Sequence, residues 1–583
     1  MAEHFGVLAL APPVLAIVLA MTTRQVLVSL FAGVWVGALL VAEWNPVGAT
    51  ALTMDWLVEV VRSPFDTKFI ILILFMGAGA AFIYRSGGIL ALERAIGDRV
   101  STARESQILT WLIGVFIFFD SYTSTVVTGN ATRELSQENY SSREMHAYAL
   151  DSTTSPVTTF GPVSNWIGFQ VSMIIAGFEA TRVTAQELGV TAFGLFLQSI
   201  PWNIYCFMAF FMVGFISITQ RFFGPMLDAE WRARSTGATI KDDATPLSDV
   251  SADVGEPSEK NPSLVNFFAP ILVLLVTGLV SMWYLGGGYE PGVDIATAFQ
   301  ETDVALGLLY GAFAFMLTGF VGSLAYRTMD LEEASETIID GFKTMVIALA
   351  IIVLAWAIGL AAENVGTAQY IVDVMVGSGV PGGFLPLIVF VAAMFVAFTT
   401  GTSWGTMAIL TPLAIPLSLE LVGPSVLPVV VAMLFGGAIW GDHSSPISDT
   451  TVMSSIFAGS DHIDHVSTQI PFAATAAGVT VVVLVLYGLG LRTPFVALPL
   501  AFVLTAAAVL ALNKLDARRK GLPEVMPEAE AIQSGEVDVE RVENGTADER
   551  ISSYSHLAPV PVAAVVVVTG YLALVFVFAM LGG

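Results

Sequence analysis

Four short stretches of the sequence carry serine and threonine in otherwise apolar surroundings, and three of them also carry carboxylates. They are Phe118–Asn130, Asp151–Thr159, Thr399–Thr406 and Gly441–Thr451. Carboxylate, hydroxyl and carbonyl oxygens are the hard ligands that a small alkali cation prefers, and carboxylates also carry protons. Ionisable side chains inside membrane spans are costly and are usually functional. The pattern therefore predicts binding sites for a cation and a proton.

The candidate ion- and proton-binding residues are the carboxylates of these stretches and their polar neighbours. They are Asp120, Asp151, Asp442, Asp449, Ser124, Asn130, Ser155, Thr402, Ser403, His443, Ser445, Ser448 and Thr450. As a hypothesis, Na+ binds at Asp442, Asp449, Thr402 and Ser403.

Structural roles compete with these assignments. The carboxylates could form buried ion pairs or helix caps, and the threonines at 158, 159, 450 and 451 could instead hold helices together. His443 could carry protons or simply bond to a neighbouring helix. Arg133 and Arg143 are the cationic side chains closest in sequence to the candidate carboxylates. The depth at which these two arginines lie in the membrane therefore helps to separate buried ion pairs from ion-binding carboxylates.

The order of the stretches predicts two related halves. Asp120 lies 31 residues before Asp151, and Thr402 lies 40 residues before Asp442. Pro156 and Pro446 follow Asp151 and Asp442 in the second and fourth stretches, and proline interrupts a helix. Transporters built from inverted repeats place their sites where broken helices meet near the bilayer midplane. We therefore expect two related, inverted repeats with broken or re-entrant helices.

Composition predicts the fold class. The 583 residues are 55% hydrophobic and only 13% charged, and the mean hydropathy is +0.76. Apolar runs long enough to cross a bilayer, about 20 residues each, recur along the chain. We expect an all-α, multi-pass plasma-membrane protein with about 12–14 transmembrane segments. No nucleotide-binding glycine loop or other enzyme signature is present, so we expect a transporter without a cofactor and not an enzyme.

The net charge is −25, and two polar segments of the chain are acidic. We expect a first transmembrane repeat at 1–220, an acidic cytoplasmic loop at 221–263, a second repeat at 264–513, another acidic cytoplasmic loop at 514–557 and a C-terminal helix at 558–583. Their composition predicts loose or disordered loops. Basic groups that include Arg85, Arg221 and Lys520 place these loops in the cytoplasm. The acidity suits a halophilic source or a regulatory loop, and it excludes nucleic acid as a partner.

Several motifs resemble the NhaC-type sodium/proton antiporter family. They are GDHSSPISDTTVMSS at 441–455, AGSDHIDHVSTQIPFA at 458–473, TTGTSWGTMAIL at 399–410 and the opening PPVLAIVLAMTTRQVLVSLFAGVWVGALL at 12–40. The resemblance implies a two-repeat fold with re-entrant hairpins, a dimer with a moving transport domain, and Na+ and H+ as the transported ions. Asp120-Ser121 departs from the two adjacent aspartates of many relatives, and Ser467 stands where many have arginine.

The NhaC-type family also contains exchangers of organic acids, for example proteins that exchange malate for lactate. The alternative function is therefore a Na+- or H+-coupled carrier of a small organic acid or amino acid. Such a carrier needs a cationic group in its cavity, and Arg133 and Arg143 are the best candidates. The cluster Asp461–His465 resembles a set of metal ligands, but its position predicts a helix-connecting loop at the membrane surface.

Overall fold

The computed structural model describes most of the chain. The described residues are 5–23, 25–96, 100–118, 121–161, 164–179, 181, 191–246, 257–258, 260–293, 297–298, 302–367, 370, 373 and 381–534. Asp120, most of the second acidic segment and the predicted helix at 558–583 lie outside the described residues.

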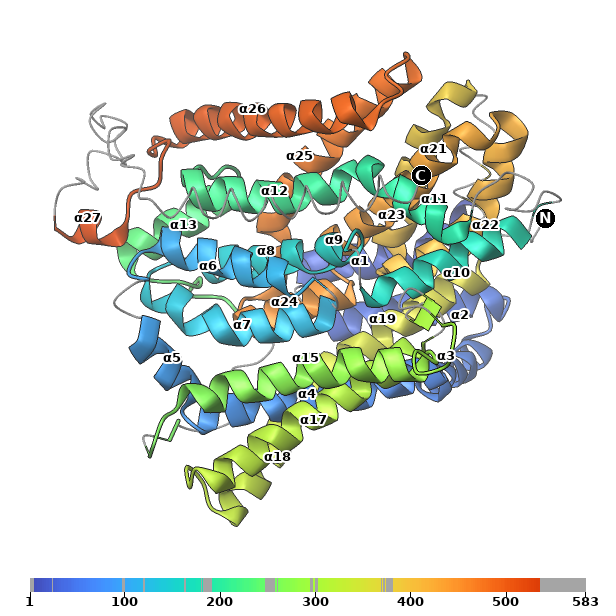
Figure 1. Ribbon diagram of the computed structural model, residues 1–583. Coiled ribbons are helices and arrows are strands. Elements are labelled where there is room, and N and C mark those ends of the chain that lie inside the picture. Colours follow the sequence, from blue (N-terminus) through green and yellow to red (C-terminus); the bar gives the residue numbers. More distant parts are fainter. Residues whose placement is uncertain are drawn as a thin grey trace.

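Throughout these residues the chain forms helices and no strand (Figure 1). The first half contains η1 (Gly6–Leu10), α1 (Ala11–Thr23), α2 (Val26–Val41), α3 (Pro46–Arg62), α4 (Pro64–Arg85), α5 (Gly88–Ile96), α6 (Ala103–Phe116), α7 (Ser121–Glu138), α8 (Arg143–Thr153), α9 (Ser155–Thr158), α10 (Asn165–Glu179), α11 (Ala192–Ser199), η2 (Ile200–Trp202), α12 (Ile204–Thr219) and α13 (Pro225–Thr236). The second half contains α15 (Leu264–Leu285), α17 (Val304–Ala325), α18 (Leu331–Thr344), α19 (Val346–Asn364), η3 (Gly382–Phe384), α21 (Leu385–Thr400), α22 (Ser403–Leu421), η4 (Pro424–Val426), α23 (Leu427–Ser444), α24 (Asp449–Ala458), α25 (His462–Gly488), α26 (Pro494–Lys520) and α27 (Ala529–Gln533).

Within this part of the chain, nine helices are long and apolar enough to cross a membrane, and two bent helix pairs raise the number to eleven. One pair bends by 46° between η2 and α12, and the other by 120° between α2 and α3. The predicted 12–14 segments included the terminal helix, which is not among the described residues. The all-α, multi-pass fold class is confirmed.

Each of the four polar stretches lies at a helix break. The breaks separate α6 from α7, α8 from α9, α21 from α22, and α23 from α24. At the third break Gly401 has φ +69°, and a Cβ atom there would lie 2.6 Å from the Ile447 carbonyl oxygen. Only glycine meets both conditions without strain. The broken helices are thus observed, whereas the inverted relation between the two halves stays a prediction.

The buried apolar side chains form two large cores. Core A is built by α1–α5, α7, α15, α17, α19 and α24, and core B by α6, α9–α13, α21–α23 and α25–α27. Helix α8 contributes to both. In Figure 1, α4, α15 and α17 lie along one side of the molecule, α12, α25 and α26 lie along the opposite side, and α7, α8 and α24 lie between them. Each core combines segments from both halves of the sequence.

The first acidic segment is partly an ordered helix, so the expected loose loop is wrong for α13. Glu230 on this helix is fully buried and forms a 2.8 Å ion pair with the equally buried Arg234. The Glu230 carboxylate also accepts hydrogen bonds from the backbone N–H of Ser142, at 2.8 Å, and from Gln107, at 2.9 Å. Composition predicts solvation for such a segment, but pairing inside the fold compensates the buried charges.

The basic groups expected in the cytoplasm lie together at one end of the bundle. Arg221 pairs with Glu524 at 3.2 Å, and Lys520 pairs with Asp228 at 2.8 Å. Helices α5, α13 and α27 lie at this end, while α3 and α22 lie at the other (Figure 1). Helix α4 has 22 residues and is therefore about 33 Å long, so Asp66 in its first turn lies far from Arg85 in its last.

We predict that Arg234→Met lowers the apparent melting temperature of the purified protein. The change leaves Glu230 buried without its cation, which costs about 3–5 kcal/mol. Thermal unfolding followed by tryptophan fluorescence measures the effect. The double variant Arg234→Met/Glu230→Gln should recover part of the loss, and Lys343→Ala, which removes an exposed partner of Asp340, should unfold like the wild type. Equal melting temperatures for Arg234→Met and the wild type would contradict the structural role.

Candidate functional site

The candidate site is centred on the first turn of α24. Asp442 lies near the end of α23 and is 1% exposed. Its carboxylate accepts hydrogen bonds from the hydroxyls of Ser448, at 2.6 Å, Thr450, at 3.2 Å, and Ser403, at 3.3 Å. Ser448 is also the N-cap of α24, and its side chain accepts from the backbone N–H of Thr451. The break between α23 and α24 therefore places two hydroxyl oxygens beside Asp442, and the start of α22 supplies the third from Ser403.

A second carboxylate, Asp151 of α8, lies on the other side of the same turn. It accepts from the Thr451 hydroxyl at 3.0 Å and from the Gln469 amide at 2.6 Å. Ser454 completes the set at 3.4 Å. The Thr451 hydroxyl also lies 3.2 Å from the Asp442 carbonyl oxygen, so one side chain bridges the segments that carry both carboxylates.

The third carboxylate, Asp449, begins α24. It accepts from the Tyr122 hydroxyl at 2.5 Å and from the backbone N–H of Thr450 at 2.8 Å. Because the hydroxyl of Thr450 contacts Asp442 while its N–H contacts Asp449, the two carboxylates share this residue. The positive end of the helix dipole lies at this turn and favours negative charge there.

Within the described part of the chain, neither Asp442, Asp449 nor Asp151 forms an ion pair with lysine or arginine. Arg143 instead donates to the carbonyl of Ala458, at 3.2 Å, at the opposite end of α24. Arg133 lies beside Gly459 at that same end. Ten helical residues, about 15 Å, thus separate both arginines from Asp449.

The remaining candidate residues lie in several places. His443 bonds to the hydroxyls of Ser152, at 2.8 Å, and Tyr205, at 2.7 Å, which is the structural alternative considered for it. The Ser445 hydroxyl donates to the carbonyl of Phe398 at 2.7 Å. Ser124 donates to Gly114 at 3.3 Å, Asn130 donates to Val126 at 2.8 Å within α7, and the buried Ser155 hydroxyl has no hydrogen-bond partner in the described structure.

Thr402 faces a cavity of about 340 Å³ that also contains Asp449. Its side chain caps α22 by accepting from the N–H of Gly405 at 3.3 Å. Among the four residues of the Na+ hypothesis, Ser403 therefore contacts Asp442 directly, while Thr402 and Asp449 line the adjoining cavity.

Sequence reasoning missed four residues that bind these carboxylates: Tyr122, Thr451, Ser454 and Gln469. Gln469 is an uncharged polar residue in a long apolar helix, which is a weak signal. Its amide also donates to the carbonyl of His443, and its oxygen faces His465 at 2.9 Å. Tyr122 lies in the first polar stretch, but its alignment with Asp449 depends on the packing of α7 against α24.

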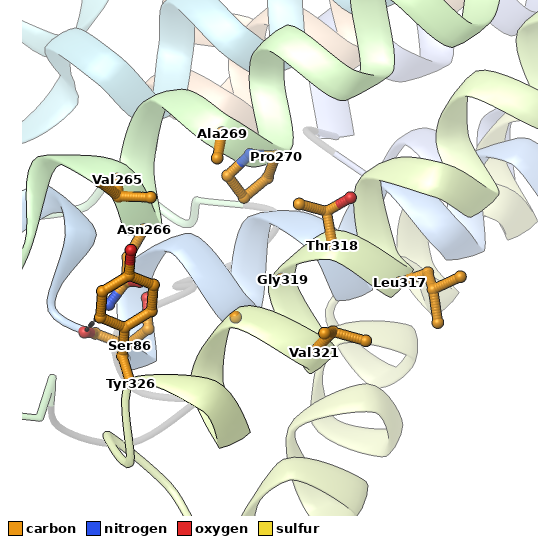
Figure 2. A pocket seen from close by; sticks show the side chains of 11 residues that line it. Ser86, Val265, Asn266, Ala269, Pro270, Leu317, Thr318, Gly319, Val321 and Tyr326 are labelled. Atoms are coloured by element: carbon orange, nitrogen blue, oxygen red, sulfur yellow. Dashed lines mark hydrogen bonds between the residues drawn. The ribbon is translucent and has the colours of Figure 1, made fainter.

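A second cavity, of about 380 Å³, lies between the end of α4 and the crossing of α15 and α17 (Figure 2). Val265, Val321 and Tyr326 on its wall are exposed, and the Asn266 amide donates to the Ser86 carbonyl at 3.2 Å. The residues that line this cavity carry no charge. It is a mostly apolar groove between helices and offers no carboxylate for an ion.

The Asp461–His465 cluster lies at the start of α25, with Asp461 as the N-cap, and its side chains are buried within the protein. Asp461 caps this helix by accepting from Ile463 and Asp464, and Asp464 pairs with Lys241 at 2.6 Å. Among the described residues no group of three or more His, Cys, Asp or Glu could hold a metal ion.

Broken helices that meet at buried carboxylates, in a multi-pass helical chain, define a membrane transporter. The chain belongs to the Na+/H+ antiporter family, whose model matches residues 157–489. The resemblance drawn from its motifs is thereby confirmed.

The chain is similar in sequence to three further proteins. An uncharacterized protein of Haemophilus influenzae is 30% identical over 483 residues, which cover 82% of this chain and 89% of that protein. The malate-2H+/Na+-lactate antiporter of Bacillus subtilis is 26% identical over 208 residues, 33% of this chain and 39% of that protein. An uncharacterized Na+/H+ antiporter of Haemophilus influenzae is 28% identical over 144 residues, 22% of this chain and 30% of that protein.

We predict that Thr451→Val slows transport at least tenfold, because the isosteric change removes the donor shared by Asp151 and the Asp442 carbonyl. Ion-driven pH changes in proteoliposomes measure the rate. Thr451→Ser should retain most of it. Thr480→Val removes a buried hydroxyl that bonds only within α25, and it should behave like the wild type. Normal transport by Thr451→Val would exclude this bridge from the site.

Proposed function

We propose that the protein exchanges Na+ for H+ across the plasma membrane. The observation that carries this proposal is the convergence of Asp442, Asp449 and Asp151 on the first turn of α24, with no basic partner in the described part of the chain. Membership of the Na+/H+ antiporter family supports the same ions.

The chemistry follows from the cost of buried charge. A carboxylate without a counterion in a low-dielectric interior is unstable, and binding a proton or a cation removes that cost. Asp442 offers its carboxylate together with the hydroxyl oxygens of Ser403 and Ser448, which are suitable ligands for Na+. One proton or one sodium ion neutralises the same group. If the carrier crosses the membrane only when the site is neutralised, exchange follows, and no cofactor is needed.

The decisive variant is Asp442→Asn, which keeps the shape of the side chain and removes its charge. We expect loss of Na+-driven proton movement in proteoliposomes that contain a trapped pH dye. Asp228→Asn is the matched control because Asp228 is an exposed carboxylate at the basic end of the bundle. Both variants must reach the membrane and elute as the wild type does. Full exchange activity in Asp442→Asn would refute the assignment.

Competition between the two ions predicts a pH dependence. We assume that each bound Na+ displaces one proton. At pH values low enough for protons to occupy the site, the half-saturating Na+ concentration should then rise about tenfold for each unit by which the pH falls. Initial rates over a matrix of pH and Na+ concentration measure this. The maximal rate at saturating Na+ should change far less. A half-saturating concentration that is independent of pH would indicate separate sites.

An organic-acid exchanger is the second candidate, because one relative is named a malate-2H+/Na+-lactate antiporter. Such a substrate needs a cationic partner. The candidate arginines, Arg133 and Arg143, lie at the opposite end of α24 from Asp449. The liposome assay separates the two functions, because a pH change that requires added malate or lactate would favour the organic acid over Na+ alone.

A further inference from the structure

The cavity beside Asp449 has an unusual lining for a path that serves only an inorganic ion. Its wall contains five aromatic side chains, two carboxylates and a threonine: Phe69, Tyr122, Phe169, Trp356, Trp404, Asp66, Asp449 and Thr402. Na+ binds oxygen ligands, whereas ring faces attract larger, weakly hydrated cations. We call this the aromatic cavity.

The rings of the aromatic cavity come from two sides. Phe69 and Tyr122, from α4 and α7, lie with their ring centres 5.1 Å apart. Phe169 and Trp404, from α10 and α22, lie 4.4 Å apart. Trp356 of α19 lines the cavity together with Asp449. The first pair and Trp356 belong to core A, and the second pair packs on core B, so the space lies between the two cores.

The charge of the cavity selects for cations. No lysine, arginine or histidine occurs among the described residues that line it, and neither Asp66 nor Asp449 has a basic ion-pair partner in the described structure. Two carboxylates facing aromatic walls suit a positively charged organic group and repel an organic acid.

The aromatic cavity has a route to the surface. A neighbouring cavity of about 320 Å³ shares four of its lining residues: Asp66, Trp356, Thr402 and Gly405. That neighbour also contains Glu59 and Glu363, which are both exposed. Carboxylates therefore line the two cavities from the exposed Glu59 and Glu363, past Asp66, to Asp449. This entrance lies at the end of α4 opposite Arg85, which is the outer side in the orientation given by the basic groups.

We propose that the aromatic cavity binds a small organic ammonium ion, with Asp66 and Asp449 pairing with its charge and the rings enclosing its alkyl groups. A volume of about 340 Å³ is at the lower end of the range for small-molecule sites, which fits a compact amine. The inference rests on the proposed function in one respect, since Asp449 serves both: the ammonium ion takes the place of Na+ in exchange for protons, and no covalent step is involved.

Quaternary ions are the appropriate probes because they cannot lose a proton and cross the bilayer as neutral amines. We expect saturable binding of choline or tetramethylammonium to the purified protein, measured by calorimetry and by quenching of tryptophan fluorescence. The neutral isostere of choline, 3,3-dimethyl-1-butanol, should bind at least tenfold more weakly. Asp66→Asn should weaken choline binding at least tenfold.

The aromatic contribution has its own variants. Trp356→Leu and Trp404→Leu should each weaken binding about three- to thirtyfold, the range expected for a cation–π contact. Trp356→Phe and Trp404→Phe keep a ring and should retain most of the affinity, which separates recognition from a folding defect. Trp44→Leu changes an exposed tryptophan outside the cavity and should bind as the wild type does.

Parallel flux measurements separate the two proposals. If Na+ moves protons but neither quaternary ion binds, the cavity inference is overturned and Na+/H+ exchange stands. If a quaternary ion binds and moves protons while Na+ does not, the cavity inference stands and Na+ is not the substrate. If neither cation binds or moves protons, both fail. Binding that is unchanged in Asp66→Asn and in both Trp→Leu variants also overturns the inference, because it places the ligand elsewhere.

Discussion

Carboxylates that have no basic partner in the described residues, buried beside one helix turn, determine how the surrounding segments are arranged. Asp442 and Asp151 are each 1% exposed, and hydroxyl and amide donors supply their contacts. Ser448 and Thr450 reach Asp442 because α23 ends and α24 begins between these residues. Gln469 reaches Asp151 from within the continuous helix α25, so the packing of α25 against α8 supplies that contact.

The same constraint explains the distribution of positive charge. A lysine or arginine beside Asp442 would neutralise it permanently and leave nothing for a transported ion to compensate. In the described structure Arg133 and Arg143 instead lie at the C-terminal end of α24, where Arg143 donates to the Ala458 carbonyl, and Arg234 lies at the basic end of the bundle, where it compensates Glu230. Permanent ion pairs stabilise the surrounding helices. In the proposed exchange, the carboxylates at the first turn of α24 are instead neutralised by the transported ions.

The fold class and the breaks were predictable from the sequence because apolar length and local polarity determine both. Contacts within the fourth stretch, such as that of Asp442 with Ser448, join residues six positions apart and follow from one break. Long-range partners were not predictable. Gln469 reaches Asp151 across 318 residues through the packing of α25 on α8. The order of α13 was missed because composition counts charges and cannot show which of them pair in the interior.

The position of the aromatic cavity between the two cores has a mechanical consequence. A solute that touches rings on both walls gains contact energy only while the walls are close, so its binding favours the closed arrangement by that difference. A solute too small to span the gap touches one wall and leaves the arrangement unchanged, however strongly it is attracted. If the cavity binds an organic cation as proposed, reach across the gap, together with charge, decides which solute favours the closed arrangement.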